Sequence, residues 1–166
     1  MSRSRLFLAG VAVLLVSVAA ACAGGSGPEA PQPALVQLPP AARAGQWVLF
    51  GHIRSLERKS GRFEMLFDPA WLLNGVAAER AAVEDKAISP GDPVPNDGQY
   101  TVDEGHRLLT FVVAAKAPVT VLEGGLSRTR ITVSELALRG FGDGFGFWIR
   151  VGEKCLVLSL DQQYQP

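Results

Sequence analysis

The distribution of hydrophobic and polar positions divides the chain into three parts. Residues 6–21 form an uncharged stretch rich in Leu, Val and Ala, and residues 22–45 consist mainly of Gly, Pro, Ala, Gln and Ser. From residue 46 onward, apolar positions recur in short runs separated by clusters of Gly, Pro, Asp and Asn. This pattern predicts a leader at residues 1–21, a flexible linker at 22–45 that buries too little surface to fold, and one β-rich domain at 46–166.

Most of the domain has the pattern of short strands. Residues 46–56 and 62–67 flank a polar turn that ends in Gly61. Residues 147–151 and 155–160 flank a second turn, which begins with Gly152. Apolar runs on either side of a short, glycine-containing turn are typical of β-hairpins. Three further short strands are expected at residues 100–102, 108–114 and 119–122.

Helices are expected in two places. Asp68 followed by Pro69 has the form of a helix start, and the Ala-rich segment 76–86 would continue that helix. Thr132 and the glutamate three positions later have the spacing of a capping box, which predicts a brief helix through residue 139, although the neighbouring β-branched residues would equally suit a strand. Many short strands with a helical insertion predict a mostly β fold of the α+β class, either a small antiparallel curled sheet or an OB-like barrel.

The leader has the three-part layout of a secretory signal. Arg3 and Arg5 form a positive start, the apolar stretch follows, and three alanines precede Cys22. The apolar stretch is shorter than the about 20 residues that a membrane-spanning helix needs. Small residues directly before a cysteine resemble the lipobox of bacterial lipoproteins, which implies a lipid such as palmitate on Cys22 and a position at the extracytoplasmic face of the cell membrane. Ordinary cleavage at the same bond, giving a secreted protein, is the alternative.

The charge balance does not favour nucleic-acid binding. The chain has 16 basic and 16 acidic residues, and Arg3 and Arg5 belong to the leader, so the mature protein carries a small net negative charge. A surface that binds nucleic acid needs clustered Lys and Arg. The one basic stretch, residues 54–62, is interrupted by Glu57 and is interpreted as a solvated hairpin end.

The chain contains two cysteines, Cys22 and Cys155. If Cys22 carries a lipid, Cys155 has no partner within the chain and no disulfide is expected. Cys155 begins an apolar run and has no histidine near it in the sequence, so it is interpreted as a small buried hydrophobic residue rather than a reactive thiol.

Candidates for metal or acid–base chemistry gather in and after the loop at residues 87–99. They are Asp92, Asp97, Asp103, Glu104 and His106. An EF-hand register places prolines at two of its ligand positions, so solvated carboxylates are expected, with neither a metal nor a cofactor. His106 beside Asp103 or Glu104 leaves an acid–base pair open, whereas His52 is expected to be structural. Motifs for a serine nucleophile or a phosphate-binding loop are missing.

The segment 140–148 alternates glycine with larger residues, mainly aromatic. If it is extended, one face has no side chains and the other presents phenylalanines to a backbone or a flat sugar ring. The candidate binding residues are Phe141, Phe145, Phe147 and Trp148. A loop is the favoured interpretation, because closely spaced glycines make a poor strand.

Three stretches of the domain resemble a recurring pattern in uncharacterised exported actinobacterial proteins. These are residues 78–85, 90–97 and 162–166. The resemblance implies export and a single domain after the linker, and it adds no mechanism.

These observations favour a cell-envelope lipoprotein that acts as a non-enzymatic binding module for another envelope protein or a glycan. The alternative is a small envelope hydrolase or metal-dependent enzyme that uses His106 with Asp103 or Glu104. A purely structural role in the envelope is a third possibility that the sequence does not separate from the first.

Overall fold

The computed structural model describes residues 41–103, 105, 107–124, 127–142 and 144–164. The leader, Cys22 and most of the linker lie outside these residues, so the expected lipid attachment and export remain predictions. In the described part of the chain, no helix is long and apolar enough to span a membrane.

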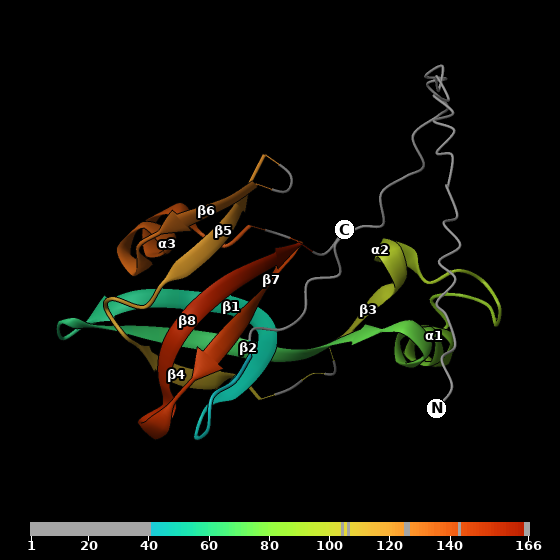
Figure 1. Ribbon diagram of the computed structural model, residues 1–166, viewed down its shortest axis with the longest axis horizontal. Helices are drawn as coiled ribbons and strands as arrows, with labels where there is room; N and C mark the ends of the chain where they lie inside the picture. Colours follow the sequence, from blue (N-terminus) through green and yellow to red (C-terminus); the bar gives the residue numbers. More distant parts are fainter. Residues whose placement is uncertain (1–40, 104, 106, 125–126, 143, 165–166) are drawn as a thin grey trace, which may run out of the picture. The chain divides into compact units, whose positions relative to one another are not determined.

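Five strands form a closed ring. They are β1 (Trp47–Lys59), β2 (Arg62–Asn74), β4 (Leu109–Val113), β7 (Phe145–Val151) and β8 (Leu156–Tyr164). The ring runs β1-β2-β4-β8-β7 and returns to β1, and every pair is antiparallel except β4 with β8. In Figure 1 the ribbons of β7 and β8 run across those of β1 and β2. This is the strand circuit of an OB-type barrel, so the predicted mostly β, barrel-like fold is confirmed.

The barrel interior is filled by apolar side chains from alternate positions of its strands. The largest fully buried side chains on these strands are those of Phe67, Phe147, Met65, Ile149 and Leu160, and Leu136 joins them from the helix Val133–Arg139. Complete burial of such a side chain contributes about 1.5–3 kcal/mol. Both predicted hairpins are present as β1–β2 and β7–β8, because their apolar positions alternate on either side of glycine-containing turns.

A further antiparallel pair of strands and a helix extend the sheet beyond β8. Strand β5 (Val119–Glu123) pairs in parallel with β8, and β6 (Ser127–Ile131) pairs with β5. Helix α3 (Val133–Arg139) follows, and its capping box is formed because the Glu135 backbone N–H donates to the Thr132 hydroxyl at 3.1 Å. The helical interpretation of this segment is therefore correct, and its Val133 and Leu136 side chains pack into the core.

The far end of β2 carries another extension, made of three elements. Residues Trp71 to Asn74 of β2 pair with β3 (Gln99–Val102), and α1 (Gly75–Glu84) and the single turn α2 (Pro95–Gly98) lie between them in the chain. The Ala-rich helix is confirmed, and Gly75 stands at its start.

The expected helix start at Asp68 and Pro69 is wrong. Both residues belong to β2, where they pair with His52 and Gly51 of β1. Strand pairing outweighs the local capping signal, because glycine at position 51 lets the two backbones approach closely. The proline is tolerated because of its place in β2. As far as the described residues show, residues 68–70 lie between the segment of β2 that pairs with β4 and the segment that pairs with β3.

Candidate functional site

A cavity of about 350 Å³ lies between the middle of β1 and the segment that leads into β7. Its lining residues are His52, Ile53, Arg54, Phe141, Gly142, Gly144 and Phe145. The volume falls at the lower end of the range of small-molecule sites, about 300–1,000 Å³. Two aromatic rings and the glycine backbone form one wall, and three consecutive residues of β1 form the other.

The glycine-rich segment is a loop rather than an extended strand. Gly140, Gly142 and Gly144 have φ angles of 77°, 68° and 79°. L-residues with a side chain rarely adopt this conformation, so the repeated glycines turn the chain instead of extending it. The loop interpretation is therefore correct, and β7 begins only at Phe145.

The four predicted binding residues are distributed over three environments. Phe141 and Phe145 both line the cavity. Trp148 is half-buried outside the barrel, with its ring centroid 4.9 Å from that of Phe50. Phe147 has 0% exposed surface and lies in the core, so the expectation that it binds a ligand is wrong. Residues along a strand point alternately to opposite faces, and Phe147 shares the inward face with Ile149.

The polar wall of the cavity comes from a bulge in β1. The β1–β2 register shifts between Ile53 and Ser55, which makes Arg54 the extra residue. Its Nε and Nη2 atoms both donate to Oδ2 of Asp68, at 2.9 and 2.5 Å. The Asp68 side chain is 11% exposed and the Arg54 side chain 51% exposed. The carboxylate is therefore shielded, while Arg54 lines the cavity and half of its side chain is exposed.

Sequence reasoning did not find this ion pair. Arg54 appeared to be part of a solvated basic stretch, and Asp68 appeared to be a helix cap. One signal in the sequence could have shown that Asp68 lies in a strand. Apolar residues alternate over residues 62–67, and the strand continues past Asp68 if that residue is not taken as a helix cap. A bulge depends on the partner strand and has no reliable signal in a single sequence.

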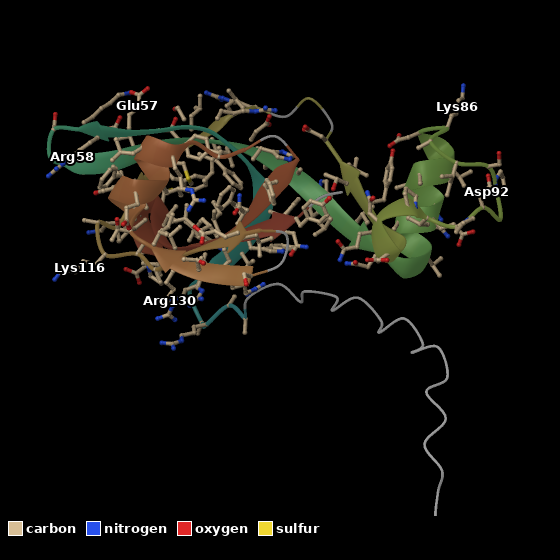
Figure 2. All side chains as sticks on the ribbon, turned by 90° about the horizontal axis from the view of Figure 1, so that it is seen from above. Glu57, Arg58, Lys86, Asp92, Lys116 and Arg130 are labelled. Carbon is tan, nitrogen blue, oxygen red and sulfur yellow. The ribbon has the colours of Figure 1, made fainter. Side chains whose placement is uncertain are left out.

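The remaining basic and acidic residues of the hairpin end and the loops project away from the fold. Figure 2 shows this for Glu57, Arg58, Lys86, Asp92, Lys116 and Arg130. All six side chains are exposed. The interpretation of the basic stretch as a solvated hairpin end is thus confirmed for its tip.

Cys155 is exposed, and its interpretation as a buried hydrophobic residue is wrong. It lies in a short 3₁₀ turn (Glu153–Cys155) between β7 and β8, with a φ of 56°. The apolar run predicted the strand correctly, but β8 begins one residue later, at Leu156.

The acidic loop does not form a ligand cluster in the part of the chain that the structure describes. In that part, no group of three His, Cys, Asp or Glu side chains is placed to hold a metal ion. Asp92 accepts a hydrogen bond from the Ser89 backbone N–H at 3.1 Å, and Asp97 and Asp103 are exposed. Glu104 and His106 lie outside the described residues, so the acid–base pair is not tested.

One tyrosine near this loop is hydrogen bonded to an acid. The Tyr100 hydroxyl donates to Asp85 at 3.0 Å. Partial burial and this bond raise the pKa of Tyr100 above its ordinary value, so the hydroxyl stays protonated at neutral pH. It fixes β3 to the end of α1 and supplies no base.

Comparison with known proteins adds no assignment, since no family model, curated protein or solved structure matches the chain. The described part of the chain is an OB-type barrel with a cavity between β1 and the glycine-rich segment that leads into β7.

Proposed function

We propose that this protein is a lipid-anchored binding protein at the extracytoplasmic face of a cell membrane, and that its barrel binds a glycan in the cavity beside β1. The observation that carries this proposal is the pair of phenylalanines, Phe141 and Phe145, on one wall of a concave site whose opposite wall is polar. Small-ligand sites combine apolar surface with placed polar groups, and residues of both kinds line this cavity.

The size and the chemistry of the cavity favour a sugar over a protein surface. A volume of about 350 Å³ accommodates one or two sugar rings, whereas a stable protein interface requires about 800 Å² from each partner. Flat aromatic rings pack against the C–H faces of a sugar, and polar groups on the opposite wall hydrogen bond its hydroxyls. The charge balance gives no support to a nucleic-acid ligand.

Few groups on the described walls of the cavity could do chemistry, which is why binding is proposed rather than catalysis. The two rings and the glycine backbone carry no group that transfers a proton, and on the opposite wall the imidazole of His52 is the group of that kind among the described lining residues. Among the described residues, the carboxylate of Asp68 beside the cavity is engaged by Arg54 through two hydrogen bonds. General acid–base work needs a group within hydrogen-bond reach of the reacting atom and free to exchange its proton.

Binding is tested with an array of soluble cell-wall and capsule oligosaccharides, followed by titration calorimetry on those retained. Phe145→Ala and Phe141→Ala should each weaken binding by about tenfold, because a lost aromatic contact is worth about 1 kcal/mol or more. Trp71→Ala is the matched control, since Trp71 is 64% exposed on β2 and does not line the cavity. Equal losses in all three variants, or unchanged binding in the phenylalanine variants, would show that the cavity is not the glycan site.

Anchoring is tested separately. Cells that express the full chain are labelled with an alkyne analogue of palmitate, and Cys22→Ser should abolish the label while Cys155→Ser keeps it. Release of wild-type protein into the medium without label would support the secreted alternative.

A further inference from the structure

We propose that β6 pairs with an extended segment of another protein that carries an acidic side chain at every second position. Such pairing adds a strand to the edge of an existing sheet, and its main-chain hydrogen bonds supply most of the affinity. The inference goes beyond the glycan cavity, since no residue of β6 is among the described lining residues of that cavity. It is carried by the free edge of β6 and by two arginines on one of its faces.

Strand β6 ends the sheet on one side. The strand order closes with β8-β5-β6, and among the described residues β6 pairs with β5 alone. Figure 1 shows β6 on the side of β5 that is away from β8. In an antiparallel pair, alternate residues direct their N–H and C=O groups toward the partner strand, and the other residues direct them away from it. The far edge of β6 therefore presents backbone donors and acceptors to a further strand.

The geometry of this edge suits an added strand. All residues of β6, Ser127–Ile131, pair with β5 in continuous register without a bulge. The Thr129 hydroxyl donates to Oε2 of Glu123 at 3.0 Å, and the Ile131 side chain packs against the core, so the strand is held in place. Edge strands are often protected by a proline, a bulge or a covering helix. Strand β6 contains no proline, and the helix that follows it packs its buried side chains into the core.

Arg128 and Arg130 give one face of this edge a positive charge. Side chains alternate along a strand, so both arginines lie on the same face, and both are exposed. Arg130 projects away from the fold in Figure 2. Within the part of the chain that the structure describes, neither arginine forms an ion pair. Gly125 and Leu126, which precede β6 and lie outside the described residues, carry no charge.

The described neighbours of β6 leave this charge uncompensated. The residues of β5 that lie opposite the two arginines are the uncharged Thr120 and Leu122. Asp161 of β8 lies one strand further along the same row, at two strand spacings or about 10 Å from β6. Glu123 pairs with the first residue of β6 and therefore lies on the other face, where Arg139 binds it at 3.1 Å.

The two arginines determine which strand fits this edge. Two β6 strands from separate copies of the chain would bring arginine opposite arginine, which is unfavourable. A strand with glutamate or aspartate at every second position would instead place an acid opposite each arginine. The charges therefore disfavour a second copy and favour an acidic partner, so that one pair of residues supplies both the attraction and the rejection on which specificity depends.

The test measures binding of short synthetic peptides to the full chain in detergent. The probe is a dye-labelled peptide of the sequence Thr-Glu-Val-Glu-Val-Glu-Thr, followed by fluorescence anisotropy, and its counterpart has lysine in place of each glutamate. The glutamate peptide should bind at least tenfold more tightly, because cross-strand pairs of opposite charge are favourable and pairs of like charge are unfavourable. Equal binding of the two peptides, or binding of neither, would overturn the proposal.

Matched double variants assign the preference to β6. Arg128→Gln combined with Arg130→Gln should weaken binding of the glutamate peptide about tenfold. Arg58→Gln combined with Arg62→Gln removes the same charge from the exposed hairpin end and should bind like the wild type. Thermal unfolding shows which variants are folded, and Arg130→Gln alone, with an expected loss of about threefold, remains informative if its double variant is not. Equal losses in the two double variants would overturn the proposal, because net charge alone would then govern binding.

Two N-methylated forms of the glutamate peptide test the strand pairing itself. One is methylated at one set of alternate amides and the other at the remaining set. Since alternate N–H groups of a strand point to opposite sides, only the form methylated on the side that faces β6 should lose binding. Equal binding of both forms would overturn the proposal, because side chains would attract the peptide without a paired strand. Sedimentation of the wild type should show no self-association that the glutamate peptide competes away; such self-association would assign this edge to a second copy instead.

Discussion

Replacing Gly51 with alanine tests how closely β1 and β2 approach beside the cavity. A Cβ atom at this position would lie 2.0 Å from the carbonyl oxygen of Asp68 and 2.8 Å from Cα of Pro69. Both contacts are with backbone atoms, so a change of rotamer cannot relieve them. The two strands would have to separate at the point where the Arg54–Asp68 pair is held.

The size of the effect follows from three contributions. Overpacking costs about 1–3 kcal/mol and occasionally more, and each backbone hydrogen bond lost between the strands costs about 1 kcal/mol. Alanine recovers about 0.4–1 kcal/mol by restricting the unfolded chain. The expected loss in free energy of unfolding is about 3 kcal/mol, which lowers the Tm by about 10 °C for a domain of this size.

Urea unfolding followed by tryptophan fluorescence measures this loss. Gly105→Ala is the control, because a Cβ there meets no atom within 4 Å. Gly146→Ala should fall between the two, since its nearest contacts are ring atoms of Phe50, the closest at 2.2 Å, and a side chain shifts more easily than a backbone. A Gly51→Ala loss as small as that of Gly105→Ala would refute the close approach.

Three further predictions concern the ion pair, the helix cap and the thiol. Arg54→Ala should destabilise the fold by about 1–3 kcal/mol and more than Asp68→Asn, since only the first leaves a buried carboxylate without its partner; equal shifts in thermal unfolding would contradict this. Hydrogen bonds from the backbone and side chain of Thr132 hold the pKa of Glu135 below its ordinary value, so the cap stabilises α3 above that value and is lost as the pH falls through the lowered pKa. Amide chemical shifts of α3 recorded against pH should show this loss, and Glu135→Gln should remove the dependence. Cys155 should react with a thiol reagent in the folded protein nearly as fast as in urea, and protection would be inconsistent with its exposure.

The sequence predicts most of the strands because their signals are local. Alternating apolar positions around Gly61, and around the turn at Gly152, are sufficient to predict the two hairpins of the barrel. The capping box at Thr132 likewise predicts α3, because its hydrogen bonds join residues three apart.

What the sequence does not predict depends on contacts between distant residues. The Asp68-Pro69 signal is a true local preference that is overridden by pairing with His52 and Gly51, sixteen or more positions earlier in the chain. The cavity could be predicted only in part. The glycines marked a loop and two of the four aromatic residues line the cavity, but the bulge that brings Arg54 to the site is created by its partner strand.

Strand β8 has consequences for how the fold is completed. It pairs with β7, β4 and β5, and all three precede it in the chain. Until β8 is available, each of them has an unpaired edge, and such edges invite association with other chains. A fragment that stops before residue 156 should therefore self-associate instead of forming a smaller version of the barrel. During synthesis, the chain must remain open until its β8 segment has emerged.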